Sequence, residues 1–363
     1  MTKPSVMVLF GGRSSEHSIS CLSAGSILAA IDRDQYEVVA VGITEAGDWV
    51  RHSGNPDELR SEAGQLPVVT GEGRVELSLS PQRHGLWLTD AAGGRDWQPV
   101  DVVFPVLHGP YGEDGAVQGA LEVAGMPFVG SGVFASAACM DKAHTKKLLS
   151  AEGIPAGRWH ALRHDEWGQE DHRERIATLG WPVFVKPARA GSSVGVSKAR
   201  DEQELKAAID AAGAHDPRII VEASVENALE VECGVLVGPD RVPRASVCAR
   251  IKVGPEHEFY DFEAKYLDDS VELIVPADIP QAVSTGIQEL AIAAFQAMDC
   301  EGLARVDVFV GADGEVSINE INTMPGFTAI SMYPRMWQET GVSYQQLVAS
   351  LIGEALSRRQ GLR

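Results

Sequence analysis

Near the C-terminal end of the chain, apolar and polar residues alternate with a period of two. Successive residues of a strand point to opposite faces, so in the run 303–310 Arg305 and Asp307 share a polar face. The next alternating run places Glu320 and Asn322 together in the same way. The pattern therefore predicts two neighbouring strands that present an arginine, two carboxylates and an amide on matching faces.

Two interpretations fit this polar face. Carboxylate and amide oxygens suit Mg²⁺, which usually bridges to substrate phosphates. The alternative is the solvated face of an antiparallel hairpin. The loop Thr323–Thr328 follows directly and contains Pro325 and Gly326. A loop of this kind beside the polar face favours a site, and we expect a nucleotide-dependent enzyme.

The first 130 residues have the pattern of a doubly wound parallel sheet. A continuous apolar run closed by two glycines predicts a buried strand, and a helix and a second strand follow it. Residues 45–100 are rich in Gly, Pro, Asp and Arg and predict hairpin-like strands of a surface elaboration. The expected strands are Ser5–Phe10, Tyr36–Ile43, Asp101–Leu107 and Pro127–Gly130, and the expected helices are 16–31 and Ala116–Ala124.

The remainder predicts an α+β part built from two further units. A helix carries three lysines within residues 140–147, and a long polar segment, Lys252–Ser270, is expected to be a loop. The expected strands are Val183–Lys186, Gly195–Lys198, Arg218–Glu222, Leu229–Val237 and Arg244–Ile251, and the expected helices are Asp201–Ala212, Pro280–Met298 and Tyr344–Arg358.

Composition excludes several classes of protein. The length of 363 residues predicts two or three domains, with 44% hydrophobic and 23% charged residues, as in globular proteins. The net charge of −20 argues against a nucleic-acid partner. No stretch approaches the roughly 20 apolar residues that span a bilayer, so we expect no membrane partner. Five scattered cysteines and an N-terminal apolar run too short for a signal peptide predict a cytoplasmic protein.

A glycine-serine segment follows the strand that ends at Lys186. Small residues such as Ser192 and Ser193 let backbone N–H groups converge on phosphate oxygens, and Lys186 adds a positive charge. A simple Gly-Ser hairpin is the alternative. Lys142 would complete a clamp on a triphosphate, unless it is an exposed helical lysine.

Two further regions offer acidic groups. Glu222 and Glu230 lie where a segment that joins two units would contact adenine and ribose. Glu16 begins the helix after the first strand, where it either caps the helix or binds a substrate ammonium. His108 leaves another strand of the same sheet and either lines this crevice or has a structural role.

Taken in order, these segments resemble the D-alanine–D-alanine ligase family of the ATP-grasp superfamily. The resemblance covers nearly the whole chain, and it implies domains at 1–130, 131–222 and 223–363, the last two forming the ATP-grasp fold. The segments are GGRSSEH (11–17), HGPYGEDG (108–115), MDK (140–142), KPARAGSSVGV (186–196), EAKYL (263–267), RVD (305–307) and NEINTMPGFTAISMYP (319–334).

The resemblance implies that ATP phosphorylates the carboxylate of one D-alanine and that the amine of a second attacks the acyl phosphate. The product would enter peptidoglycan precursors. Two Mg²⁺ ions, for which Mn²⁺ can substitute, would bind Asp307, Glu320 and Asn322. Arg305 and the backbone N–H of Gly326 would stabilise the developing oxyanion.

The resemblance also assigns ligands to the other residues. Lys142 and Lys186 would hold phosphates, with Glu222 and Glu230 at adenine and ribose. Glu16 would bind the first ammonium, hydrogen-bonded to a Ser192–Tyr266 pair that holds the loop near 252–270 closed. The second carboxylate would bind Lys265, Ser331 and Met332.

Several alternatives stay open within this resemblance. Tyr266 goes with an amine second substrate, whereas phenylalanine there is associated with D-lactate, so D-alanine–D-lactate and D-alanine–D-serine ligases are neighbouring hypotheses. A catalytically dead ATP-binding regulator should have lost a metal ligand or Arg305, and the chain retains them. An oxidoreductase fits less well, because Gly11-Gly12 does not continue as GxGxxG. The family also implies a homodimer.

Overall fold

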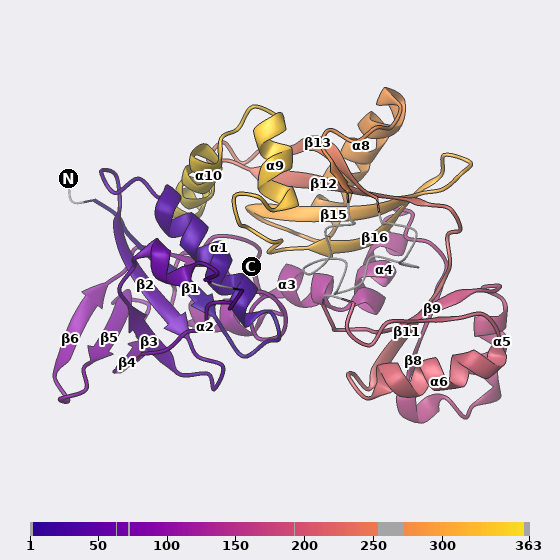
Figure 1. Cartoon of the computed structure of the whole chain (residues 1–363), viewed down its shortest axis with the longest axis horizontal. Helices are drawn as coiled ribbons and strands as arrows, with labels where there is room; N and C mark the ends of the chain where they lie inside the picture. Colours follow the sequence, from indigo (N-terminus) through magenta and orange to yellow (C-terminus); the bar gives the residue numbers. More distant parts are fainter. Residues whose placement is uncertain (1–2, 63, 72, 192, 253–271, 359–363) are drawn as a thin grey trace.

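The computed structural model describes residues 3–62, 64–71, 73–191, 193–252 and 272–358. Its strands form four sheets, arranged along the long axis of the molecule (Figure 1). The N-terminal sheets lie at one end, the sheet around β12 and β15 occupies the middle, and a module around β9 and β11 forms the other end. In this described part, no helix is both long enough and apolar enough to cross a membrane.

The first sheet has the strand order β3-β2-β1-β7, with β1 parallel to both neighbours and β3 antiparallel. Its bounds are β1 Ser5–Gly11, β2 Glu37–Ile43, β3 Trp49–His52 and β7 Val102–Pro105. Helix α1 (His17–Ala30) covers one face, packing on Val8, and α2 (Ala116–Val123) covers the other, packing on Leu9. Burial on both faces explains why β1 is continuously apolar from Val6 to Phe10.

The elaboration after β3 contains a short 3₁₀ helix, η1 (Pro56–Leu59), and a separate antiparallel sheet of three strands. Trp87 and Trp97 face each other across two of these strands, with ring centroids 5.1 Å apart, and the Arg83 guanidinium stacks on both rings. The strands are β4 Arg74–Leu77, β5 Gly85–Thr89 and β6 Arg95–Pro99.

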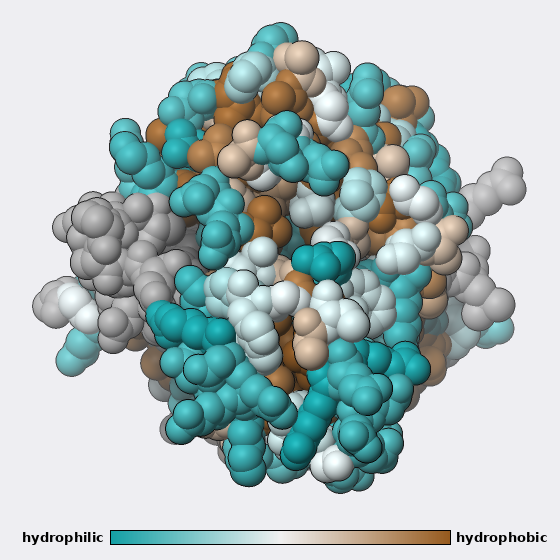
Figure 2. Space-filling model, turned by 90° about the vertical axis from the view of Figure 1, so that its right-hand side faces the viewer, coloured by the Kyte–Doolittle hydropathy of each residue, from teal (hydrophilic) through white to brown (hydrophobic). Residues whose placement is uncertain are grey.

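The second unit is an antiparallel sheet of order β10-β9-β11-β8 backed by α5 and α6. Side chains on the end of the molecule that this unit forms are mostly hydrophilic (Figure 2). The bounds are β8 Trp159–Arg163, η2 His164–Glu166, α5 Glu170–Ala177, β9 Val183–Pro187, β10 Ser197–Ala199, α6 Glu202–Gly213 and β11 Arg218–Ala223.

The third unit is an antiparallel sheet of order β14-β13-β12-β15-β16. Helix α8 packs on its apolar face, whereas α9 packs on part of the opposite face and leaves the polar side chains of β15 and β16 beside it. The bounds are α3 Val133–Met140, α4 Lys142–Ala151, β12 Leu229–Val237, β13 Pro243–Lys252, β14 Glu272–Ile274, α8 Gln281–Ala297, β15 Leu303–Val310, β16 Val316–Asn322, α9 Met332–Glu339 and α10 Tyr344–Ser357.

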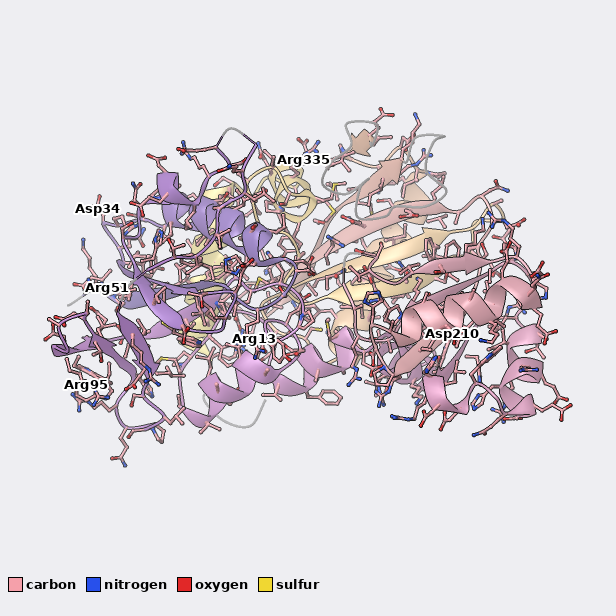
Figure 3. All side chains as sticks on the ribbon, turned by 60° about the horizontal axis from the view of Figure 1, so that its bottom comes forward. Arg13, Asp34, Arg51, Arg95, Asp210 and Arg335 are labelled. Carbon is pink, nitrogen blue, oxygen red and sulfur yellow. The ribbon has the colours of Figure 1, made fainter. Side chains whose placement is uncertain are left out.

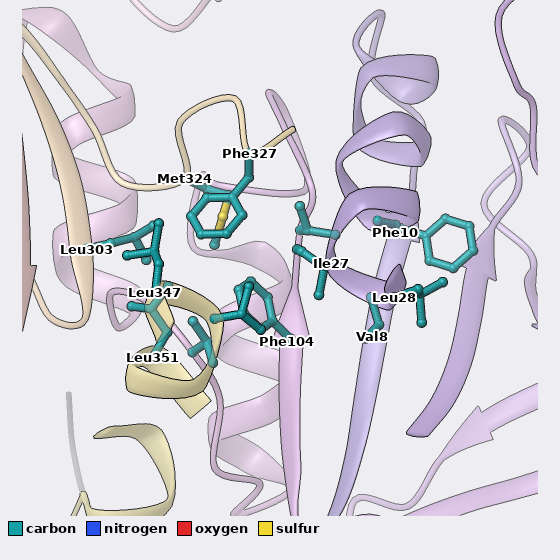
Figure 4. Packing of buried hydrophobic residues seen from close by; sticks show 14 of the residues in the cluster. Val8, Phe10, Ile27, Leu28, Phe104, Leu303, Met324, Phe327, Leu347 and Leu351 are labelled. Carbon is teal, nitrogen blue, oxygen red and sulfur yellow. The ribbon is translucent and has the colours of Figure 1, made fainter. Parts of the chain in front are cut away.

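One hydrophobic core joins the first sheet to the third. Leu347 and Leu351 of α10 pack in the same cluster as Ile27 of α1 and Phe104 of β7 (Figure 4). Phe327, from the loop after β16, contacts Phe104 with ring centroids 5.8 Å apart. The C-terminal helix therefore lies against the N-terminal sheet, although the predicted domain boundaries assign it to residues 223–363.

Most predicted elements are present, with one error and several omissions. The strand predicted at Pro127–Gly130 is wrong, because only Phe128 forms a β-bridge, with Val103. The segment follows the turn after α2 and touches the edge of the sheet at that single point. The elements that the sequence pattern missed are α3, α5, α9, β8, β14 and the two 3₁₀ helices η1 and η2.

Candidate active site

The polar residues of β15 and β16 lie on one face of the third sheet, as the alternation predicts. In the antiparallel β15–β16 pair, Arg305 lies opposite Asn322 and Asp307 lies opposite Glu320. On the other side of β15, Glu232 of β12 lies opposite Asp307. Three adjacent strands thus bring an arginine, an amide and three carboxylates to one surface.

Carboxylates hold Arg305 tightly within this group. Its Nε donates to Asp307 Oδ1 at 2.7 Å and its Nη2 to Asp307 Oδ2 at 2.6 Å, while Glu232 Oε1 lies 3.3 Å from Nε. Asn322 Nδ2 also donates to Asp307 Oδ2, at 3.1 Å. Burial opposes the charge on Arg305, but Asp307 and Glu232 outweigh it and hold the pKa of the guanidinium well above its usual value.

A second cluster of charges lies across the cavity from this face. Glu222 forms ion pairs with two lysines. Lys146 Nζ lies 2.8 Å from Glu222 Oε1, and Lys186 Nζ lies 2.6 Å from Glu222 Oε2. Burial alone would raise the pKa of Glu222, but the two lysines lower it to about 2. Glu222 also raises the pKa of Lys186 against the effect of burial. Glu222 and Lys186 are therefore both charged at neutral pH.

The start of α4 fixes Lys142 in this cavity. Asp141 caps the helix by accepting from His144 N at 3.1 Å, and its carboxylate also pairs with Arg218. Lys142 Nζ then donates to the backbone oxygen of Ala190 at 2.8 Å and lies 3.4 Å from Glu320 Oε2. The helix thus places Lys142 between the glycine-serine segment and the polar face of the third sheet.

The donor set on β15 and β16 fits a hard cation. Mg²⁺ usually binds one or two carboxylates together with substrate phosphates and water, rather than a complete protein cage. Asp307 and Glu320 supply two carboxylates on facing strands, and Asn322 adds an amide. In the described part of the chain, no three His, Cys, Asp or Glu side chains are grouped to hold a metal. Two carboxylates and an amide on facing strands are a donor set that fits Mg²⁺ bound together with phosphate oxygens.

Three loops converge on Glu16. A methyl group added at Gly109 would lie 2.9 Å from Glu16 Oε2, and one added at Gly191 would lie 3.1 Å from it. Ser14 Oγ donates to the backbone oxygen of His108 at 2.7 Å, which joins the first two loops. The Glu16 carboxylate thus lies close to the backbone at Gly109 and Gly191, where a side chain larger than hydrogen would crowd it. This position is between the first sheet and the glycine-serine segment.

The loop that contains Gly326 is held from the first sheet. His108 Nδ1–H donates to the backbone oxygen of Met324 at 3.0 Å, and its Nε2 lies 3.2 Å from Ser23 Oγ. Ser23 Oγ in turn accepts from Phe327 N at 3.3 Å. Burial lowers the pKa of His108, which favours the neutral ring. His108 is thus buried and hydrogen-bonded to the loop, and it helps to fix the position of Gly326.

The predicted residues for the second carboxylate lie just beyond this loop. Ser331 is the N-cap residue of α9, and its Oγ accepts from Thr328 N at 3.1 Å. Met332 is buried at the first position of the helix. Lys265, Tyr266 and Ser192 lie outside the described residues, as does most of the predicted loop 252–270.

A cavity of about 640 Å³ lies between the second and third units, within the size range of small-molecule sites. The predicted residues that line the cavity are Lys142, Lys186, Ser193, Glu222, Glu230, Arg305, Asp307 and Glu320.

Arg13 lies nearer the centre of the molecule, between Arg95 at one end and Asp210 of α6 near the other (Figure 3). Its guanidinium stacks on Tyr111, 4.9 Å from the ring centroid.

Comparisons with known proteins agree with this geometry. Residues 5–131 match the family model for the D-ala D-ala ligase N-terminus, and residues 148–353 match the model for the D-ala D-ala ligase C-terminus. The chain belongs to the D-alanine–D-alanine ligase family.

Relatives in this family cover nearly the whole chain. The D-alanine–D-alanine ligase of Mycobacterium sp. (strain KMS) is 55% identical, with 99% of this chain and 98% of the relative covered. That of Mycobacterium tuberculosis (strain CDC 1551 / Oshkosh) is 54% identical, with 98% and 96% covered.

Solved structures of the family have the same fold. The VanG D-Ala:D-Ser ligase from Enterococcus faecalis has a TM-score of 0.85 at 35% identity, and 98% of this chain and 100% of that chain are covered. The D-alanine–D-alanine ligase from Coxiella burnetii has a TM-score of 0.81 at 32% identity, with 98% and 94% covered. The resemblance and the predicted ATP-grasp fold class are therefore confirmed.

Two charged residues of this ligase fold were absent from the predicted site. Lys146 lies one helical turn after Lys142, and Glu232 lies two strand positions after Glu230. The sequence contains a signal for each residue. The helical period of 3.6 puts Lys146 on the same face as Lys142, and the strand period of 2 puts Glu232 on the same face as Glu230. Only the folded chain shows that Lys146 meets Glu222 and that Glu232 meets Arg305.

Proposed function

We propose that this chain joins two molecules of D-alanine to form D-alanyl-D-alanine, with conversion of ATP to ADP and phosphate, for peptidoglycan precursor synthesis. The observation that carries the proposal is the convergence of two lysines, Lys142 and Lys186, on the cavity that the acids of the third sheet also line. The names of the mycobacterial relatives supply the substrate.

ATP would lie in the cavity, with its phosphates between Lys142 and Lys186 and its adenine and ribose near Glu222 and Glu230. Asp307, Glu320 and Asn322 would hold Mg²⁺, which neutralises charge on the β- and γ-phosphates. Because Glu222 already binds two lysines, we expect it to contribute mainly by fixing Lys186 and Lys146 at the entrance to the phosphate region.

The chemistry follows from where the loops converge. A carboxylate oxygen of the first D-alanine, whose ammonium binds Glu16, attacks the γ-phosphorus of ATP, and ADP leaves. The second D-alanine gives one proton of its ammonium to water, its amine then attacks the acyl carbon, and the further proton that this nitrogen loses goes to the departing phosphate. Arg305 and Gly326 N–H stabilise the oxyanion of the tetrahedral intermediate. The C–O bond to phosphate then breaks, which leaves the peptide bond.

The second substrate and its position are further parts of the proposal. Ser331 and Met332, together with Lys265, would receive the second carboxylate, and Tyr266 would favour an amine over a hydroxyl. The VanG structure belongs to a ligase for D-Ala and D-Ser, so D-serine is the alternative second substrate that the comparisons favour most.

Assembly and location complete the proposal. The family resemblance supports a homodimer. Five free cysteines, all buried, support a location in the cytoplasm. Sedimentation analysis would test the dimer.

The deciding experiment measures phosphate release from ATP and Mg²⁺ with D-alanine, L-alanine, or D-alanine plus D-serine or D-lactate, with products identified by mass. We expect release that depends on D-alanine alone, with D-alanyl-D-alanine as product. Removal of the metal with a chelator should stop release, and added Mg²⁺ or Mn²⁺ should restore it. A mixed dipeptide or depsipeptide as main product would overturn the substrate, and absence of any turnover despite ATP binding would overturn the reaction.

A further inference from the structure

Glu232 is a buried acid beside the reacting centre to which no role has yet been given. It lies on β12, the middle strand of the third sheet, and its side chain is 5% exposed. Its Oε1 lies 3.3 Å from Arg305 Nε. Burial of a charged carboxylate costs free energy unless the carboxylate is paired. The contact with Arg305 therefore offsets the cost of burying Glu232.

The position of Glu232 differs from that of the other acids around Arg305. Arg305 belongs to β15, which lies between β12 and β16. Asp307 lies on β15 itself, next to Arg305, and Glu320 and Asn322 lie on β16, whereas Glu232 approaches Arg305 from β12. Glu232 therefore contacts the arginine from a strand that carries none of the predicted metal ligands.

This arrangement gives Arg305 a partner that it does not share with the metal. Both oxygens of Asp307 accept hydrogen bonds from Arg305, yet the same oxygens are the ones that a cation would use. Any engagement of Asp307 by a cation weakens its hold on the guanidinium. An unfixed arginine side chain has many rotamers, and a misplacement of about 1 Å can lower a rate by about 100-fold.

We propose that Glu232 is a positioning residue that keeps the Arg305 guanidinium aimed at the reacting carbonyl group while Asp307 serves the metal. The inference rests on the proposed function, since it requires Arg305 to bind the oxyanion. A negative charge beside Arg305 reduces the attraction of the arginine for a developing oxyanion, so charge alone would favour a neutral residue at position 232. The benefit of Glu232 is orientation.

The alternative is that Glu232 and Arg305 form an ion pair that only stabilises the sheet. A matched control is available in Glu354, whose carboxylate is also buried and also pairs with an arginine, Arg358, far from the cavity. Comparison of Glu232→Gln with Glu354→Gln therefore separates the effect of losing a buried ion pair from an effect on the reacting centre.

The test uses the full chain and four variants: Glu232→Gln, Arg305→Lys, the double variant and Glu354→Gln. We would measure kcat, the KM for ATP, the thermal midpoint, and the Kd of a dipeptide analogue with a tetrahedral phosphinate in place of the reacting carbonyl, in the presence of ATP and Mg²⁺. The analogue reports on oxyanion binding without product turnover.

We expect Glu232→Gln to lower kcat by about 10- to 100-fold and to weaken analogue binding by a similar factor, with the KM for ATP changed less than about threefold. In the Arg305→Lys background, the same substitution should weaken analogue binding little further, because Glu232 acts through Arg305. Glu354→Gln should lower the thermal midpoint without changing analogue binding.

Two results would overturn the proposal. One is a lower thermal midpoint for Glu232→Gln with wild-type kcat and analogue affinity, as for Glu354→Gln. The other is a double variant whose loss of analogue binding equals the product of the two single losses. Failure of the proposed function would look different, because the wild-type chain itself would then make no dipeptide.

Discussion

Lys186 Nζ lies 2.6 Å from Glu222 Oε2, a diagonal contact across the β9–β11 ladder at the edge of the cavity. Lys146 approaches the other carboxylate oxygen from α4. One buried carboxylate thus holds two ammonium groups, from a helix and a strand of the chain that are 40 residues apart. The proposed phosphate-binding region is therefore positioned by an acid that need not contact phosphate.

Substitution of Glu222 by Gln should destabilise the protein by about 3–5 kcal/mol, because two buried ammonium groups lose their counter-ion. The pKa of Glu222 is lowered to about 2 from 4.5, so its stabilising effect is complete above pH 4.5 and is lost as the pH falls toward 2. Urea unfolding at pH 7 and pH 4 should show a smaller acid-induced loss for the variant. The exposed Glu226→Gln should match wild type within about 0.5 kcal/mol.

Glu113 should make the protein less stable as the pH rises. Loss of hydration, with Glu16 nearby, raises the pKa of Glu113 to about 8 from 4.5. Between these two values the folded chain retains a proton that the unfolded chain releases, so the free energy of unfolding falls as the pH increases. Glu113→Gln should remove this slope and be more stable than wild type at pH 8.5 but not at pH 5. Parallel pH profiles would contradict the assignment.

Arg305→Ala should abolish ligation while ATP binding survives. Loss of one oxyanion donor typically lowers kcat by about 100- to 1000-fold, whereas Lys142 and Lys186, the proposed phosphate ligands, are untouched. Product assays and calorimetric titration with ATP would measure the two effects, and circular dichroism would verify the fold. Wild-type turnover by this variant would exclude Arg305 from the oxyanion site.

Gly11 should tolerate substitution far less well than Gly153, although both have positive φ, at 87° and 72°. A methyl group at Gly11 would lie 2.3 Å from Ile43 O and 2.8 Å from Val69 Cγ2, whereas nothing lies within 4 Å at Gly153. We expect losses of about 3–5 kcal/mol for Gly11→Ala and about 1–2 kcal/mol for Gly153→Ala in urea unfolding. Equal losses of stability in the two variants would show that the positive φ alone, and not the space around the added methyl group, determines the cost.

Local periodicity predicted much of the fold and of the site. The shared polar face of β15 and β16 follows from alternation, whereas the facing pairs needed the structure, and the glycine turn after β1 correctly predicted the start of α1 near Glu16. Helix α9 was not predicted; Pro334 lies at its third position, and proline is tolerated in the first turn of a helix.

Contacts between distant segments could not be read from the sequence pattern. The place of β12 between β13 and β15 brings Glu232 to Arg305. Similarly, the packing of α4 against the sheet brings Lys146 to Glu222. Neither pairing leaves a local signature, because each depends on how units far apart in the sequence are arranged around a shared core.

The packing of α10 on the first sheet has a consequence for synthesis of the chain on the ribosome. Strand β1 and helix α1 emerge first, yet Ile27 and Phe104 are covered by Leu347, Leu351 and Phe327, which are made last. Until α10 has been made, the first unit of the nascent chain therefore exposes an apolar surface that the folded protein covers. Chaperones that bind such surfaces would have access to this one for longer than to surfaces that are covered earlier.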